Sequence, residues 1–318
     1  MTAARTSGTP SAALEVEGVI LRHRGGRGLG PITLSAGPGE TLGVMGHNGA
    51  GKTTLLRLCA TVDRPQRGSL RWFGASSPRA ARVDLGVALD TTEEEGSLSG
   101  RQSAHFWCSQ WTGAARAGPL VAAALTRLGL GGVADEPVAS YSFGMRRRLT
   151  LAGALAHQPR LALLDEPTAG LDPEGMETLR EICAERSAAG LTTVVASNDP
   201  GFVATGCDRV AFVRQGALVR CDVPAALLGD AVGGVTVDLE LAPGPEPAVD
   251  GAIGELLPAP AGATVRLRAG VAVERLVAAV DRPAGRLRAL RVRGATLADV
   301  YTRLTGETLV AADGGGPR

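Results

Sequence analysis

A glycine-rich stretch at residues 46–54 has the residue types and the spacing of a phosphate-binding loop. It fits G-x-x-x-x-G-K-[ST] at every fixed position. In such a loop, backbone N–H groups surround the β-phosphate of a nucleotide, Lys52 reaches the β- and γ-phosphates, and Thr53 gives its hydroxyl to Mg²⁺. The sequence therefore predicts a nucleotide phosphate site made by Gly46, His47, Asn48, Gly49, Ala50, Gly51, Lys52, Thr53 and Thr54.

Two adjacent carboxylates, Asp165 and Glu166, follow the short apolar run Leu161–Leu164. Such a run is typical of a buried strand, so both carboxylates stand at a strand end. In a protein with a phosphate-binding loop, Mg²⁺ and the attacking water are handled at this place. We expect Asp165 to bind the metal shell and Glu166 to polarise water. The alternative, two surface acids at a strand end, is disfavoured by the loop.

A third candidate lies between these two motifs, at Tyr141–Arg146 directly ahead of an apolar-periodic helix. Ser142 and Gly144 give a helix start whose free N–H groups and hydroxyl can meet an anion. By itself the stretch reads as a simple helix cap. Its position between the loop and the carboxylates favours an anion-binding role.

The elements that position these residues alternate between strands and helices. Thr41–Met45 reads as a buried strand before the loop, and Thr54–Leu58 opens a helix after it. Further strands are expected at 14–17, 32–34, 68–74, 161–164, 192–196 and 209–213, with helical pattern over residues 101–131 and 179–184. This alternation over residues 14–228 predicts an α/β domain built on a mostly parallel sheet that is covered on both faces.

The chain changes character after Leu228. Expected strands at 235–241, 264–268 and 287–292 alternate with helices at 271–280 and 297–304, and a Pro/Gly-rich stretch interrupts them at 242–247. We therefore predict a small α+β domain at residues 229–310. Residues 1–13 are expected to form a disordered arm, and residues 311–318 a flexible tail.

The composition excludes several classes of function. Lys and Arg total 33 and Asp and Glu total 32, so the net charge of +1 offers no electrostatic case for nucleic-acid binding. The five cysteines have no C-x-x-C spacing, which argues against a disulfide framework or a zinc site and favours a reducing compartment. No window of 18 residues is continuously apolar and the N-terminus lacks the apolar core of a signal peptide, so we expect a cytoplasmic chain that does not itself cross a membrane.

Together, four ordered motifs resemble those of the nucleotide-binding subunit of an ATP-binding cassette (ABC) transporter. Gly46–Thr53 is similar to the Walker A motif, Leu161–Glu166 to the Walker B motif with its catalytic glutamate, Tyr141–Met145 to the signature motif, and Thr168–Pro173 to the D-loop. The resemblance covers residues 14–228. It implies a P-loop NTPase fold, with a RecA-like core and a helical subdomain at about residues 98–150, that binds ATP and Mg²⁺.

The same resemblance implies partners. In this family ATP is held between the phosphate-binding loop of one subunit and the signature of another, so a homodimer or heterodimer is expected, with Ser142 and Gly144 acting across it. Closure on ATP and reopening after hydrolysis would drive a separately encoded membrane permease, which implies a location on the inner face of the cell membrane.

The form of the signature motif indicates which class of ABC transporter the chain resembles. Tyr141–Arg146, which reads Tyr-Ser-x-Gly-Met-Arg, is similar to ABC-2-type exporters of the daunorubicin- and bacitracin-resistance types, and Ala295–Gly306 resembles the close of their C-terminal domain. This implies efflux of a drug, an antibiotic or another hydrophobic compound. Export of a polysaccharide or haem is the alternative, because the permease selects the substrate.

The sequence departs from the family at three positions. Asn198 stands where a histidine normally contacts the γ-phosphate, and Asp90 stands where a glutamine is usual. Asp90 is expected to ligate Mg²⁺, at the cost of repelling the γ-phosphate. His23, or its neighbour Arg24, replaces the aromatic residue that stacks on adenine.

These departures lead to the hypothesis that the chain binds MgATP normally but hydrolyses it slowly. One alternative is a degenerate partner within a heterodimer, against which Lys52, Glu166 and the signature argue. Another is a protein that acts on ribosomes without a permease. Such proteins usually hold two cassettes, and this chain has one phosphate-binding loop.

Overall fold

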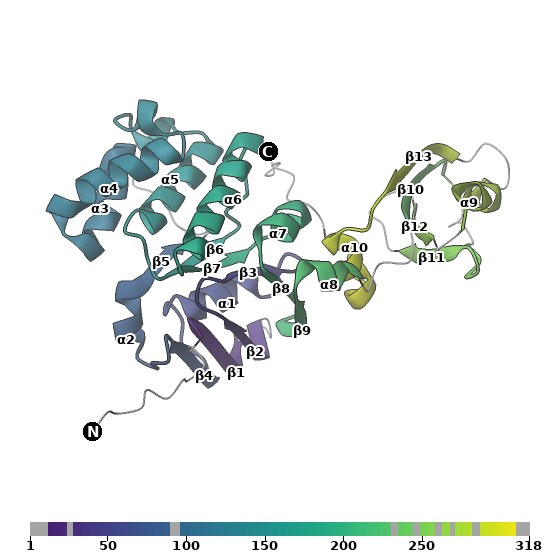
Figure 1. Ribbon diagram of the computed structural model, residues 1–318, viewed down its shortest axis with the longest axis horizontal. Helices are drawn as coiled ribbons and strands as arrows, with labels where there is room; N and C mark the ends of the chain where they lie inside the picture. Colours follow the sequence, from purple (N-terminus) through teal and green to yellow (C-terminus); the bar gives the residue numbers. More distant parts are fainter. Residues whose placement is uncertain are drawn as a thin grey trace, which may run out of the picture. The chain divides into compact units, whose positions relative to one another are not determined.

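The computed structural model describes residues 12–23, 28–89, 96–229, 235–243, 249–257, 263–267, 271–281 and 287–309. The chain divides into two compact units, the first built mainly on residues before Asp222 and the second on residues Asp222–Asp313 (Figure 1). Helix α8 (Pro224–Gly229), in which the expected boundary near Leu228 falls, belongs to the second unit.

A six-stranded sheet forms the centre of the first unit, in the order β5-β6-β7-β3-β8-β9. The neighbours from β5 to β8 pair in parallel. Its strands are β3 (Thr41–Met45), β5 (Leu85–Ala88), β6 (Leu161–Asp165), β7 (Thr192–Ala196), β8 (Arg209–Arg214) and β9 (Ala217–Asp222). Every residue of β3, β6 and β7 is buried, as expected for parallel strands covered on both faces. The expected buried strands are thus confirmed.

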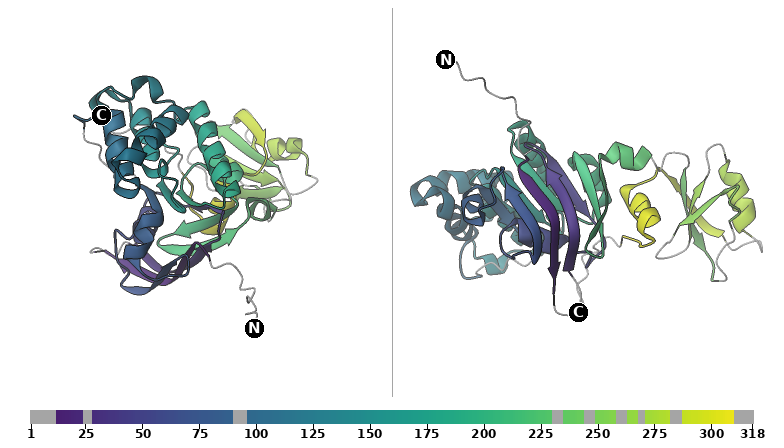
Figure 2. Two further views of the ribbon diagram at one scale, coloured as in Figure 1. Left: turned by 60° about the vertical axis from the view of Figure 1, so that its left-hand side comes forward. Right: turned by 90° about the horizontal axis from the view of Figure 1, so that it is seen from below.

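A second sheet of the first unit is antiparallel, and here the expectation of one mostly parallel sheet was incomplete. Strands β1 (Leu14–Arg22), β2 (Gly28–Ala36) and β4 (Arg67–Trp72) pair in the order β2-β1-β4 (Figure 2). The connection between β1 and β2 is too short for a parallel crossover, so the two strands form an antiparallel pair. Helix α1 (Lys52–Cys59) contacts β2 of this sheet and β6 and β7 of the other.

Three helices pack together at one end of the first unit: α3 (Gly100–Thr112), α4 (Ala114–Arg127) and α5 (Phe143–Leu155) (Figure 1). The expected helical stretch at 101–131 is confirmed as two helices, which Gly113 separates with a φ of 75°. The short α2 (Pro78–Ala81) precedes β5. Helices α6 (Pro173–Ala188) and α7 (Pro200–Gly206) follow β6 and β7, and each starts with an Asp–Pro pair whose aspartate caps the helix.

The second unit is a four-stranded antiparallel sheet with helices, in the order β11-β12-β10-β13. Its elements are β10 (Thr236–Leu241), β11 (Gly254–Leu257), β12 (Ala263–Leu267), α9 (Val273–Val280), β13 (Leu287–Arg293) and α10 (Leu297–Thr305). Val237, Leu239 and Val265 from the sheet share a core with Leu276 and Val280 of α9. The helices and strands expected in this part of the chain are confirmed, and β11 was not foreseen.

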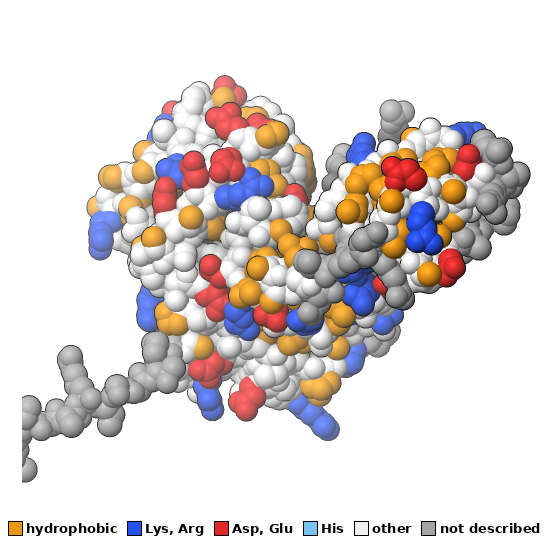
Figure 3. Space-filling model, turned by 45° about the vertical axis from the view of Figure 1, so that its right-hand side comes forward, with side chains coloured by type: hydrophobic (Ala, Val, Ile, Leu, Met, Phe, Trp, Pro, Cys, Tyr) orange, Lys and Arg blue, Asp and Glu red, His pale blue; other side chains and the backbone are white. Residues whose placement is uncertain are grey.

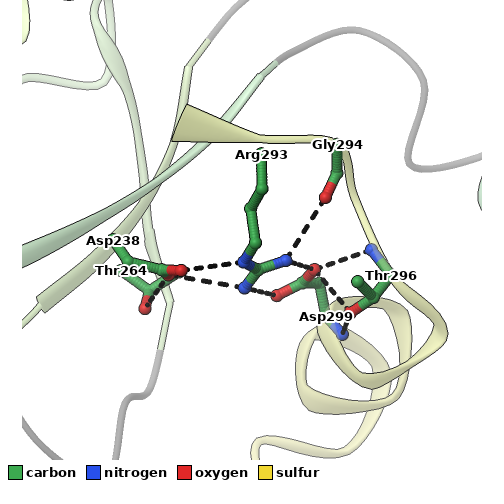
Figure 4. A network of polar contacts seen from close by, with 6 residues as sticks. All are labelled: Asp238, Thr264, Arg293, Gly294, Thr296 and Asp299. Carbon is green, nitrogen blue, oxygen red and sulfur yellow. Dashed lines mark hydrogen bonds and ion pairs between the residues drawn. The ribbon is translucent and has the colours of Figure 1, made fainter. Parts of the chain in front are cut away.

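A polar network fastens α10 to this sheet (Figure 4). Arg293, at the end of β13, donates to Asp238 of β10 at 2.8 Å and to both carboxylate oxygens of Asp299 in the first turn of α10. Asp299 also forms a capping box with Thr296. Burial by itself would raise the pKa of Asp299, but the hydrogen bonds from Arg293 and Thr296 outweigh it and hold that pKa below its usual value.

The distribution of charged side chains on the surface (Figure 3) agrees with the nearly equal numbers of basic and acidic residues in the sequence. On the face drawn in Figure 3, basic and acidic side chains lie interspersed. Within the described ranges, none of the helices is both long enough and apolar enough to span a bilayer.

Candidate nucleotide site

The phosphate-binding loop connects β3 to α1, the strand-to-helix turn that its sequence requires. Gly51 caps α1 with a φ of 107°, and no side chain caps the helix. The first N–H groups of α1 are therefore available to an anion. Gly46 approaches β8 so closely that a Cβ there would lie 2.2 Å from the carbonyl oxygen of Val213, which explains why the loop starts with glycine.

Lys52, the first residue of α1, is the centre of the site. Its side chain is only 6% exposed. The ammonium Nζ donates to the carbonyl of Gly46 at 2.7 Å and to Oδ1 of Asn198 at 2.7 Å. It also forms an ion pair with Oε1 of Glu166 at 3.2 Å. The structure therefore brings the lysine of the loop together with the strand-end glutamate.

Glu166 follows β6 in a left-handed conformation, with a φ of 46°. Its N–H donates to the carbonyl of Ala196 at 2.7 Å, which fixes the turn against β7. Its carboxylate lies between Lys52 and the backbone N–H of Asn198, which donates to Oε2 at 3.2 Å. A positive φ in a non-glycine residue is strained, and such strain is often found at functional sites.

Asn198 links the strand ends. It lies just after β7, is 3% exposed, and donates from Nδ2 to Oδ1 of Asn48 at 2.6 Å. The preceding Ser197 shares a hydrogen bond of 3.0 Å with Thr168 of the D-loop. Because β6, β7 and β3 are parallel neighbours, their carboxyl ends bring Glu166, Asn198 and the loop to one edge of the sheet.

The residues expected to hold Mg²⁺ are Thr53, Asp165 and Asp90, of which the structure describes the first two. Thr53 is the second residue of α1, and Asp165 ends β6 with 1% of its surface exposed. A hydroxyl and a carboxylate are oxygen donors of the kind that Mg²⁺ prefers. Across the part of the chain that the structure describes, no group of three or more His, Cys, Asp or Glu side chains could hold a metal. One hydroxyl and one carboxylate are a donor set that fits Mg²⁺ bound together with nucleotide phosphates.

The signature residues lie beside the D-loop. Ser142 caps α5 and accepts a hydrogen bond from the N–H of Met145 at 3.2 Å. A Cβ on Gly144 would lie 2.4 Å from the carbonyl oxygen of Gly170 in the D-loop, so the two segments touch through their backbones. Ser142 thus lies against the first turn of α5, and Gly144 against the D-loop.

Two arginines of α5 were missed by the sequence reasoning. Arg147, 7% exposed, donates to the carbonyl of Asp165 at 3.4 Å. Arg148 pairs with Asp172 at 2.6 Å. The N–H of Gly175 and then Arg148 hold the pKa of Asp172 below its usual value. The run of three arginines at 146–148 was the available signal, but helix periodicity alone did not say which of them point inward.

Asp90 and His23 are the remaining residues that the sequence places at the site. Asp90 lies outside the described residues. His23 is exposed at the end of β1, and its charge adds to the larger effect of Arg57 in lowering the pKa of Asp63. The predicted contact between His23 and adenine stays a prediction.

Comparison with known proteins finds relatives that extend over most of the chain. The family model described as "ABC transporter" matches residues 29–169. The daunorubicin resistance ATP-binding protein DrrA3 of Streptomyces coeruleorubidus is 32% identical over 313 residues, which cover 93% of this chain and 96% of that protein. This chain belongs to the ABC transporter ATP-binding proteins. It is accordingly an ATPase of the ABC family.

The names of other relatives of this ABC ATPase refer to different processes, which include drug resistance and cobalt import. The daunorubicin/doxorubicin resistance ATP-binding protein DrrA of Streptomyces peucetius is 32% identical over 221 residues, 66% of this chain and 65% of that protein. The cobalt import ATP-binding protein CbiO of Rhodobacter capsulatus is 34% identical over 227 residues, 68% of this chain and 81% of that protein. The solved dimeric ABC cassette MJ0796 shares the fold, with a TM-score of 0.60 and 21% identity over 66% of this chain and 98% of that one.

Proposed function

We propose that this ABC ATPase powers efflux of a drug, an antibiotic or another hydrophobic compound through a separately encoded ABC-2-type permease. The observation that carries the proposal is the similarity to DrrA3, which extends over 93% of the chain and so includes the second unit. The similarity to the import protein CbiO covers only 68% of the chain. Efflux is therefore favoured over import.

The proposed roles follow from the site. Residues 46–54 hold the phosphates, and Thr53 and Asp165 hold Mg²⁺, which would neutralise charge that develops on the phosphoryl group. Glu166 orients and deprotonates the attacking water. Ser142 and Gly144 contact the nucleotide of a second subunit, in a homodimer or heterodimer. Asp90 and His23 are proposed to act at the metal and at adenine, respectively.

A pocket in the first unit supports a permease as the partner. It has a volume of about 270 Å³ and is lined by Trp107, Trp111, His157, Val87 and Leu89, beside the end of β5. Trp107 and Trp111 are 40% and 39% exposed. Clustered exposed aromatic side chains mark interaction surfaces. We infer that an apolar segment of the permease binds here, at the inner face of the membrane.

Purification from membranes tests the proposal. A tagged chain should co-purify with a multi-helix permease, and Trp107→Ala should weaken this association more than Val219→Ala, which removes an exposed side chain from β9. Cells that express the pair should accumulate less of the exported compound. Co-purification with ribosomes, or greater accumulation of the compound, would refute the proposal.

One alternative rests on Asn198. A slow or degenerate partner in a heterodimer would also co-purify with a permease. The ATPase rate of the purified complex separates the two, because a degenerate subunit leaves the rate unchanged when its Glu166 is replaced by Gln. Export of a polysaccharide or haem is distinguished by which of these compounds falls in the cells that express the pair.

A further inference from the structure

The ammonium group of Lys52 has its full set of protein partners. A lysine has three N–H donors. In this structure they face three acceptors, the carbonyl of Gly46, Oδ1 of Asn198 and Oε1 of Glu166, at 2.7, 2.7 and 3.2 Å. The side chain is 6% exposed, so water does not offer an easy substitute for these partners. A phosphate group that binds Lys52 must therefore displace at least one of them.

Asn198 connects three parts of the site at once. Its Oδ1 accepts from Lys52, its Nδ2 donates to Asn48, and its backbone N–H donates to Glu166. The orientation of the amide is set by chemistry, because Lys52 can only donate and must face the oxygen. Asn48 and Lys52 are both members of the phosphate-binding loop. The side-chain amide of Asn198 thus links two residues of the loop, and its backbone N–H holds the strand-end glutamate.

We propose that Asn198 is a positioning residue that acts as a latch on the phosphate-binding loop, in competition with nucleotide phosphates. This role goes beyond the replacement of a γ-phosphate contact, because the latch opposes the binding of any nucleotide whose phosphates reach Lys52. The inference rests on the proposed role of Lys52 in binding phosphates. It makes the binding of ADP, as well as ATP, depend on Asn198.

Two substitutions at Asn198 should change nucleotide affinity in opposite directions. Asn198→Ala removes one competing acceptor and the link to Asn48, so the full-length chain should bind both MgADP and MgATP about tenfold more tightly, as fits the loss of one hydrogen bond to a charged group. Asn198→Asp keeps the shape and adds a negative charge beside Lys52, so both nucleotides should bind more weakly. Asn48→Ala removes only half of the latch and should have a smaller effect than Asn198→Ala.

Calorimetric titration of the full-length variants with MgADP and with MgATP measures these affinities. Hydrogen exchange of a peptide covering residues 46–54 provides a second measurement, in which Asn198→Ala should speed exchange before nucleotide is added. If the affinity of Asn198→Ala for MgADP equals that of the wild type or is weaker, the proposed latch is refuted. If the wild-type chain binds neither nucleotide, the proposed function itself fails. Circular dichroism confirms folding, and Asn198→Ser replaces Asn198→Ala if the latter does not fold.

Discussion

Arg148 of α5 and Asp172 of the D-loop form an ion pair, with Nη2 of the arginine 2.6 Å from Oδ1 of the aspartate. Asp172 also caps α6, because the same oxygen accepts from the N–H of Gly175. Beside this pair, the backbones of Gly144 and Gly170 are in contact. The signature and the D-loop of one subunit are thus fastened together, and a movement of α5 would be passed directly to the D-loop.

Substituting Gly144 should test this fastening. A Cβ at Gly144 would lie 2.4 Å from the carbonyl oxygen of Gly170, so Gly144→Ala must push the two segments apart. We expect the ATPase rate of the permease complex to fall by about 10²-fold, as small misplacements of catalytic groups can do. Nucleotide affinity of the chain alone should not change.

The matched control is Gly118→Ala on α4, where an added Cβ meets no atom within 4 Å. Alanine favours the helix there by up to about 1 kcal/mol relative to glycine, so this variant should fold well and keep its ATPase rate. A Gly144→Ala complex that hydrolyses ATP at the wild-type rate would show that the contact has no role.

Glu166→Gln should abolish turnover. The amide keeps the size of the side chain but cannot accept a proton from water, so we expect the rate to fall by about 10²- to 10⁴-fold. The variant should still dimerise when ATP is added, and size-exclusion chromatography measures this. Glu136→Gln, an exposed glutamate ahead of the signature, serves as the control and should keep its rate. Hydrolysis retained in Glu166→Gln would remove Glu166 from the role of base.

Asn198→His should raise the ATPase rate of the permease complex. An imidazole reaches further than the asparagine amide and can carry a proton near neutral pH, which the amide cannot. Asn198→Gln extends the reach without the proton and controls for length. A rate in Asn198→His that equals the wild-type rate or falls below it would contradict the hypothesis of slow hydrolysis.

The attachment of α10 in the second unit should weaken in acid. Because the pKa of Asp299 is lower in the folded chain than in the unfolded chain, its stabilising contribution is complete above the unfolded value and disappears as the pH falls through the folded value. At neutral pH, Arg293→Met should destabilise α10 by about 2 kcal/mol, since it leaves Asp299 without its charged partner.

Hydrogen exchange of a peptide covering residues 297–305 measures the stability of α10. The exchange rates are converted to protection factors at each pH. The difference between wild type and Arg293→Met should be largest at neutral pH and should shrink in acid. Arg288→Met replaces an exposed arginine on the same strand and should change little. A difference that is constant with pH would assign the attachment to packing instead of the Arg293–Asp299 pair.

The sequence by itself determined the parts of this protein that depend on local chemistry. The glycines and lysine of residues 46–54 have one dominant use at their spacing, and the short runs at 161–164 and 192–196 are typical of buried strands. These patterns depend on the types and spacing of a few neighbouring residues, so they can be recognised before the fold is known. The family followed from the order of the motifs.

Only the tertiary structure decided which side chains meet. Lys52 and Asn198 are 146 residues apart, and Asn48 and Asn198 are 150 apart. Their contacts exist because β7 lies between β6 and β3, and the order of strands depends on the packing of whole elements rather than on any local pattern. The same reason applies to β1, β2 and β4, whose alternating pattern predicted strands but not the separate antiparallel sheet that they form.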